Sequence, residues 1–174
     1  MTDAREIRLL SGVLCDDVRV EMSNKDILIG VYFAGVSGFQ VPIYLNLCIW
    51  LQFEASGQFE CDTTHRLRLR KGGQSVEYAS KFVSQRKGLR GRQVFDLAVL
   101  LEHEDELVYE LRIDDQPWRE QMTWPLTFVP GAGRAEFSPE DLQAMREGPL
   151  ATPRVLLVPP VFATETRAPV TPPA

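Results

Sequence analysis

The dominant pattern along the chain is the alternation of apolar and polar positions, which is typical of strands with one buried face. It is clearest between residues 43 and 55, which are therefore predicted to form a strand. The side that begins with Tyr44 and ends with Glu54 is mixed in character and is expected to be partly wet. The apolar side is expected to face the core and holds Ile43, Leu45, Leu47, Ile49, Leu51, Phe53 and Ala55.

Similar alternation predicts about eight strands in the first 130 residues or so. Turn-forming segments rich in Gly, Asn and Asp separate them, and such short links favour antiparallel pairing. We therefore expect an all-β fold, an antiparallel β-sandwich of immunoglobulin-like or C2-like type, with an open barrel as the alternative. The strands are predicted around residues 10–22, 27–33, 43–55, 67–69, 76–82, 95–101, 107–113 and 118–128.

Within this fold, residues in the middle of a strand and on an unbroken apolar side are predicted to form the core. The segment 35–40, GVSGFQ, is interpreted as a loop between strands rather than as a phosphate-binding loop. The predicted core residues are Leu47, Ile49, Leu51, Leu97, Val99, Leu111 and Trp124.

The pattern changes after Val129. Ser138 as N-cap, Pro139 at the first helical position and Gly148 after the end predict a short helix over 138–147. The apolar run within 154–158 is expected to add an edge strand or to be covered by another subunit, and the Pro-rich residues after it to form an extended arm. The predicted domain organisation is a β-sandwich over 1–130 and a C-terminal extension over 131–174.

Two adjacent carboxylates, Asp16 and Asp17, interrupt the first predicted strand. Asp16 falls on the same inward side as Leu14 and Val18, and an unpaired buried carboxylate would cost several kcal/mol. A bulge at this point, with Arg19 close to one of the acids, would solve the conflict. The alternatives are a metal or catalytic role for the pair and a contact with a partner.

These residues also carry a resemblance to a known family. The segment LCDDVRVE, followed after a polar turn by LIGVY, resembles the opening hairpin of an uncharacterised bacterial family of small β-sandwich proteins. The late segment YELRIDDQPWREQMTWPLTF is similar as well, so the resemblance spans roughly residues 9 to 129. It implies a compact all-β fold and no established activity.

Composition narrows the classes of protein further. A net charge of -5 argues against whole-molecule attraction to nucleic acid or acidic membranes. Three separated cysteines suggest neither a disulfide framework nor a zinc site, and without a signal-like or membrane-spanning run a cytoplasmic location is expected. His65 and His103 are expected at the surface, and no cofactor or metal is predicted. A calcium site would require convergence of Asp16, Asp17, Asp62, Asp114 and Asp115.

Basic residues are concentrated between residues 66 and 92, which hold nine of them against the single acid Glu77. We expect an exposed hairpin, with Leu67 and Leu69 turned to the core and the arginines between them turned outward. These arginines either form a solvated edge or bind an anionic partner, and acids 102–106 of a neighbouring copy are one such surface. The candidate partner-binding residues are Arg66, Arg68, Arg70, Lys71, Arg86, Lys87, Arg90 and Arg92.

From these features the sequence predicts a non-enzymatic interaction or scaffold module. It is expected to contact a protein partner or its own copies, as a homo-oligomer, through the basic hairpin and the C-terminal arm. An anion-binding module for nucleic acid or membrane phosphates is the alternative, and a metal-dependent enzyme that uses Asp16 and Asp17 comes third.

Overall fold

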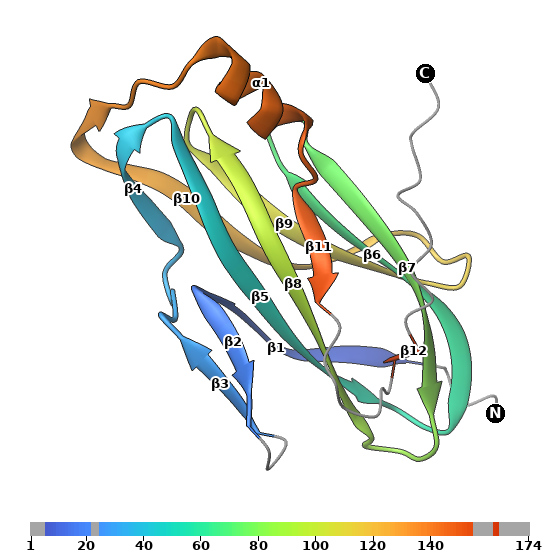
Figure 1. The fold of residues 1–174 in the computed structure, drawn as a ribbon. Helices are drawn as coiled ribbons and strands as arrows, with labels where there is room; N and C mark the ends of the chain where they lie inside the picture. Colours follow the sequence, from blue (N-terminus) through green and yellow to red (C-terminus); the bar gives the residue numbers. More distant parts are fainter. Residues whose placement is uncertain (1–5, 22–24, 155–161, 164–174) are drawn as a thin grey trace.

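Two β-sheets pack face to face in the computed structural model, which describes residues 6–21, 25–154 and 162–163. This arrangement confirms the predicted all-β sandwich (Figure 1). The four-stranded sheet has the order β1 (Ile7–Cys15), β5 (Ile43–Ala55), β8 (Arg90–Leu101), β11 (Ala151–Arg154). The six-stranded sheet has the order β12 (Phe162–Ala163), β7 (Ser75–Ser84), β6 (Phe59–Leu69), β9 (Asp105–Ile113), β10 (Arg119–Arg134), β4 (Val36–Val41).

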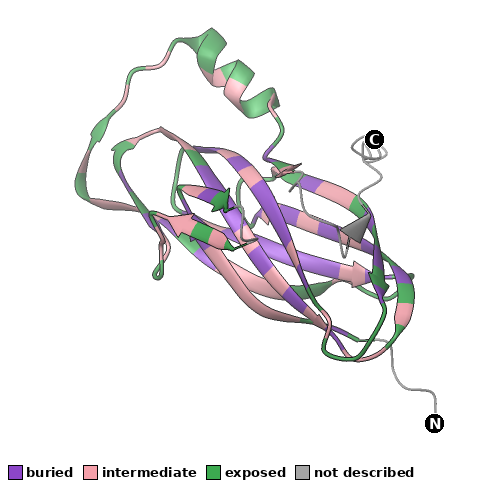
Figure 2. Ribbon diagram, turned by 60° about the horizontal axis from the view of Figure 1, so that its bottom comes forward, coloured by how far each residue is buried: buried purple, intermediate pink, exposed green. Residues whose placement is uncertain are grey.

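The core lies between the two sheets, as the alternation predicts. β5 and β8 pair antiparallel from Ile43 opposite Leu101 to Glu54 opposite Arg90, and their inward residues meet those of β6 and β9. Buried positions follow the strands of both sheets in Figure 2. All seven predicted core residues are buried, namely Leu47, Ile49, Leu51, Leu97, Val99, Leu111 and Trp124.

A small hairpin covers part of the outer face of the four-stranded sheet. It consists of β2 (Asp17–Val20) and β3 (Asp26–Ile29), which pair with each other as a separate two-stranded sheet (Figure 1). Beneath it lies a second apolar cluster of Cys15, Cys48, Val18 and Val94, with Leu28, Val31 and Trp50 packed around it. The outward side of β5, which was expected to be partly wet, is therefore dry where this hairpin lies.

Three predictions about strands are corrected by the structure. The first predicted strand is divided at Asp16 into β1 and β2, and Val20 is exposed. The strand around 27–33 stops after Ile29, because Gly30 adopts a positive φ of 63°, and Phe33 is exposed.

The third correction concerns the predicted loop at 35–40, which is strand β4. β4 pairs with β10 in parallel, from Val36 opposite Leu126 to Val41 opposite Arg134. Gly35 just before the strand and Gly38 within it weaken the local strand signal, so the strand depends on hydrogen bonds from a partner distant in sequence.

The C-terminal part adds one helix and two short strands. α1 (Pro139–Glu147) begins after Ser138, whose side chain accepts a hydrogen bond from the Asp141 amide, which confirms the predicted helix. β10 continues past residue 130 to Arg134, and β11 pairs with β8. Residues 155–158 lie outside the described part of the chain. None of the described helices is both long and apolar enough to cross a membrane.

Candidate interaction surfaces and a small pocket

The Asp16-Asp17 pair marks the point where the chain leaves the four-stranded sheet. Asp16 is exposed and separates β1 from β2, while its amide donates to the carbonyl of Ile29. Its carboxylate accepts a hydrogen bond from the Tyr32 hydroxyl. Gly30 packs directly against that carboxylate, and a Cβ on this residue would lie 1.8 Å from Oδ2 of Asp16. The predicted interruption therefore exists as a break between strands, while the register shift of β1 lies earlier, between Leu9 and Ser11.

Asp17 is held by an arginine from the far end of the chain. Nη1 of Arg154 lies 2.9 Å from Oδ1 of Asp17 and donates to the Val18 carbonyl at 2.7 Å. The same guanidinium binds Asp96 on β8. The hydrogen bond from Arg154 lowers the pKa of Asp17. The expected contact of Arg19 with Asp17 is also present, at 3.3 Å. Both carboxylates thus hold the base of the hairpin.

The far end of the hairpin is fixed by a second carboxylate, Asp26. Trp50 Nε1 donates to its Oδ2 at 2.8 Å, and Arg92 Nη1 lies 2.8 Å from its Oδ1. The Asp26 side chain is 8% exposed, so this ion pair is shielded from water. The hairpin is therefore fastened to the outer face of the sheet at both ends.

The cysteines beside the hairpin base are free and buried. Cys15 and Cys48 face each other across β1 and β5. Burial raises the pKa of Cys15 to about 11 and that of Cys48 to about 12. Since the thiolate is the reactive form, these two groups are poor nucleophiles in this environment.

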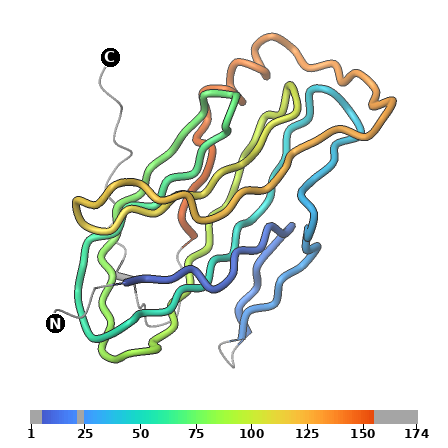
Figure 3. The backbone as a smooth tube through the Cα atoms, turned by 180° about the vertical axis from the view of Figure 1, so that it is seen from behind, coloured from blue at the N-terminus to red at the C-terminus, as the bar shows by residue number. Residues whose placement is uncertain are grey.

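The basic residues between 66 and 92 do not form one hairpin. They lie at the end of β6 and the turn after it, at one position of β7, in the β7–β8 turn and at the start of β8. The β6–β7 turn and the β7–β8 turn lie at opposite ends of the sandwich (Figures 1 and 3). The candidate binding residues are therefore divided into two groups, one at each end.

In the first group, carboxylates of the same chain already bind the arginines. Leu67 and Leu69 are buried and the arginines point outward, as the alternation predicts. Nε of Arg66 lies 2.5 Å from the Glu110 carboxylate, and Nε of Arg68 lies 3.1 Å from it. Arg70 forms ion pairs with Glu106 and Glu120. Contact with Arg66 and Arg68 lowers the pKa of Glu110 against the opposing effect of burial.

The acids expected to serve a neighbouring copy are likewise engaged within the chain. Glu102 lies 2.6 Å from Arg146 of α1, and the Asp105 carboxylate accepts from the backbone amides of Lys71 and Gly72. Glu104 accepts from the Phe128 amide at 3.2 Å. With Glu106 bound to Arg70, none of these four acids supports the expected contact between copies.

The second group lies at the β7–β8 turn and is more open. Arg86 and Lys87 are exposed, and neither forms an ion pair with the described residues. Arg90 lies 3.4 Å from Glu54, while Arg92 is bound to Asp26 below the hairpin. Two of the eight candidates thus remain open to an anionic partner at this turn.

His65 is the polar residue that the sequence prediction placed wrongly. It is only 2% exposed, in the middle of β6 and on the inward side. Nδ1 lies 2.8 Å from the Tyr109 hydroxyl and Nε2 lies 3.1 Å from the Ser80 hydroxyl. Burial lowers the pKa of His65 to about 4, so the ring is neutral near pH 7. Its shared side with Leu67 and Leu69 is the signal that could have placed it in the core.

The free edge of the six-stranded sheet is a surface that the sequence prediction missed. β4 is the last strand on its side, and in the described residues its outer edge pairs with no other strand. Phe39 on β4 is 73% exposed, and Phe33 just before it is 95% exposed. No charged residue occurs anywhere between Asp26 and Glu54. The sequence carries this signal as a long uncharged run, but only the sheet order shows that it reaches an edge.

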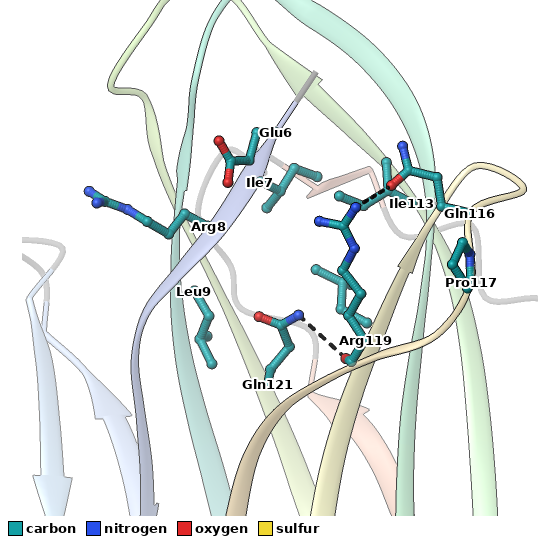
Figure 4. Close-up of a pocket in the computed structure, with 10 residues that line it drawn as sticks. Glu6, Ile7, Arg8, Leu9, Ile113, Gln116, Pro117, Arg119 and Gln121 are labelled. Carbon is teal, nitrogen blue, oxygen red and sulfur yellow. Dashed lines mark hydrogen bonds between the residues drawn. The ribbon is translucent and has the colours of Figure 1, made fainter. Parts of the chain in front are cut away.

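A small pocket opens between the start of β1 and the end of β9 (Figure 4). It has a volume of about 130 Å³. Ile7, Leu111 and Ile113 form its apolar walls, and all three are buried core residues. At its mouth Arg119 donates to Oε1 of Gln116 at 3.0 Å.

A larger cavity of about 300 Å³ lies at the α1 end of the sandwich. In its polar lining, Arg146 binds Glu102 and Asp105 accepts two backbone amides of the β6–β7 turn, while the side-chain oxygen of Gln74 is buried and has no hydrogen-bond partner among the described residues. Among the described residues, no His, Cys, Asp or Glu side chains form a group of three that could hold a metal ion. The acids considered for calcium are divided between the hairpin base and the β9–β10 connection, where Asp114 accepts from the Asp62 amide.

No family model, no curated protein and no solved structure matches the chain. The resemblance to the bacterial β-sandwich family therefore stays a prediction.

Proposed function

We propose that this protein is a non-enzymatic interaction or scaffold module that binds a protein partner or further copies of itself. The observation that carries the proposal is the uncharged free edge of β4 with its exposed Phe39. Buried thiols at Cys15 and Cys48, neither of which forms a disulfide, support a reducing compartment such as the cytoplasm.

An unprotected sheet edge is a template for pairing with another strand. Natural proteins usually blunt such edges with charges, proline or a covering segment. β4 has a Gly and a large apolar residue at its centre and no charge, so a strand can approach it without an electrostatic penalty. Addition of a strand to an edge is a recurring way in which proteins recognise one another.

Phe33 and Phe39 would add apolar contact area to the backbone hydrogen bonds of such a complex. β4 and the β2–β3 hairpin lie on the same side of the molecule (Figures 1 and 3). The hairpin contributes Ile27, which is also exposed. Exposed apolar groups on one side of a protein are typical of interaction sites.

The alternative, an anion-binding module, is supported by the β7–β8 turn. Arg86 and Lys87 have no acidic partner among the described residues, and two or three cations provide a weak contact for phosphates. The neutralised arginines of β6 do not add to this contact. A partner held here would be released by salt, whereas one held at β4 would not.

The test is to place a charge on the free edge. The Phe39→Lys substitution changes an exposed side chain, so the fold is retained while the edge gains a cation. We expect wild-type protein to show a molar mass above the monomer in light scattering, or to retain a partner in pull-down. We expect Phe39→Lys to lose that association at both low and high salt.

The matched control is Val83→Lys on β7, which adds the same charge at another partly exposed apolar position. It should associate as the wild type does. The proposal would be contradicted if Phe39→Lys and Val83→Lys associated equally, or if added salt alone abolished the association of the wild-type protein.

A further inference from the structure

The small pocket beside β1 has the volume of a site for a short aliphatic group. Its lining combines the buried Ile7, Leu111 and Ile113 with polar side chains, namely Glu6, Arg8, Gln116, Arg119 and Gln121. An apolar cavity of about 150 Å³ is large enough for benzene. The pocket measures about 130 Å³ and offers Ile7, Leu111 and Ile113 as its walls. A branched chain of four or five carbons is therefore of the right size.

Arg119 gives the mouth of this pocket a chemical preference. In Figure 4 its side chain lies between Ile7 on one side and Ile113 on the other. Within the described residues, no carboxylate lies within ion-pair distance of Arg119, and the neutral amide of Gln116 accepts its hydrogen bond. Arg8, also at the rim, is by contrast bound to Glu54 at 2.7 Å.

We infer that this pocket binds a carboxylate attached to a short aliphatic chain. The chain would occupy the space between Ile7, Leu111 and Ile113, and the carboxylate would lie against the guanidinium of Arg119. Arginine suits this role because its planar fork can donate two parallel hydrogen bonds to one carboxylate. The inference does not depend on the proposed function, because the pocket is separate from β4.

Two sources could supply this chemistry: a free short-chain acid, or the C-terminal residue of a peptide with an aliphatic side chain. The edge of β10 next to the pocket bears on the second source. β4 pairs with β10 only from Leu126 onward, and the carbonyl of Arg119 accepts a hydrogen bond from the side chain of Gln121 at 3.3 Å. A peptide backbone could replace that side chain as the donor.

The experiment is a titration of the full chain with each probe, in which binding is monitored through the backbone amide chemical shifts in nuclear magnetic resonance spectra. The probes are isovalerate, its neutral isostere isovaleramide, and the peptide acetyl-Gly-Gly-Leu as free acid and as amide. We expect isovalerate to change the amide chemical shifts of residues 6–9 and 111–121. The dissociation constant should be on the order of 1 to 10 mM for so small a ligand. The amides should bind at least about tenfold more weakly.

Arg119→Gln should abolish the preference for the acid over the amide. Arg134→Gln, at an exposed arginine on the same strand, should retain it. Tighter binding of the peptide acid than of isovalerate would identify a C-terminus as the source, and equal or weaker binding a free acid. Equal binding of acids and amides, or absence of shifts at the pocket with every probe, would overturn the inference.

Discussion

At the scale of single residues, the structure places a group of polar side chains inside the sandwich and pairs them with one another. His65, Tyr109 and Ser80 form a hydrogen-bonded group between the sheets. Buried polar groups are tolerated when they are bonded in this way, and they then favour one arrangement of the core. For His65 the bonded state is the neutral one, and this makes the stability of the fold depend on pH.

We therefore predict that the protein loses stability as the pH is lowered from 6.5 toward 4. Burial holds the pKa of His65 at about 4 in the folded chain, against 6.5 ordinarily. In this window the unfolded chain binds a proton that the folded chain does not, so the free energy of unfolding falls by up to about 1.4 kcal/mol per pH unit. Well above pH 6.5 both states are neutral at His65, and there its contribution to the slope vanishes.

Urea unfolding at pH 7.5, 6.5, 5.5 and 5.0, pH values chosen to span the upper part of this window, measures the effect. His65→Gln should be less stable at every pH but should show a flatter slope below pH 6.5. His103→Gln changes an exposed ring and should keep the wild-type slope. A slope for His65→Gln equal to that of the wild type would show that His65 is not the group responsible.

Single residues also show which features of the structure could be predicted from the sequence. Leu67 and Leu69 alternate with arginines, and this alternation predicted both sides of β6 correctly. The same alternation places His65 on the inward side. It was nevertheless predicted at the surface, because it is a polar residue. The partners of the arginines could not be predicted, because Glu110 is separated from Arg66 by 44 positions and register between strands is set by the whole sheet.

At the scale of elements, the β2–β3 hairpin is a separate unit that covers the outer face of the four-stranded sheet. Its apolar contacts are few, and charged groups fasten its ends. Arg154 holds the base through Asp17, and Arg92 with Trp50 holds the other end through Asp26. The sequence indicated that Asp16 and Asp17 interrupt a strand, but not that an arginine 137 positions away binds one of them.

We predict that Asp26→Ala weakens the attachment of the hairpin. The substitution removes the acceptor of Trp50 Nε1 and the carboxylate that faces Arg92, and both contacts are shielded from water. Loss of buried polar partners of this kind costs about 1 to 3 kcal/mol. Urea unfolding measures the cost, and Trp50 fluorescence should report greater contact with water.

Glu60→Ala is the matched control, since it removes a carboxylate from an exposed ion pair with Lys81. Surface pairs of this type contribute little to stability. A change in Asp26→Ala no larger than that in Glu60→Ala would contradict the anchoring role.

β4 is the strand that the sequence pattern did not predict. Its six residues contain no regular alternation, and its hydrogen bonds come from β10, about 90 positions later. Parallel strands are not joined by a short turn, so no turn-forming segment in the sequence indicates this pairing. A strand of this kind is recognised only once its neighbour is known, and the edge surface that it forms could therefore not be predicted.

At the scale of the whole molecule, charge is arranged so that most of it is neutralised between neighbouring strands. The basic residues Arg66, Arg68 and Arg70 are matched by glutamates of the same chain, whereas Arg86 and Lys87 form no ion pair with the described residues. The uncharged stretch between Asp26 and Glu54 instead reaches the surface at β4. The side of the molecule with the least charge, rather than the segment with the most, is therefore where we place the partner.

Hydrogen exchange of the β4 amides tests this placement most directly. Exchange is followed by mass spectrometry over a series of protein concentrations, or with and without a captured partner, and the peptide that covers 33–41 is compared with the one that covers the β7–β8 turn. We predict that β4 becomes protected as the complex forms, because its free edge amides gain hydrogen bonds, while the turn exchanges as before. A complex that forms with β4 exchange unchanged, or with protection confined to the turn around Arg86 and Lys87, would contradict this placement.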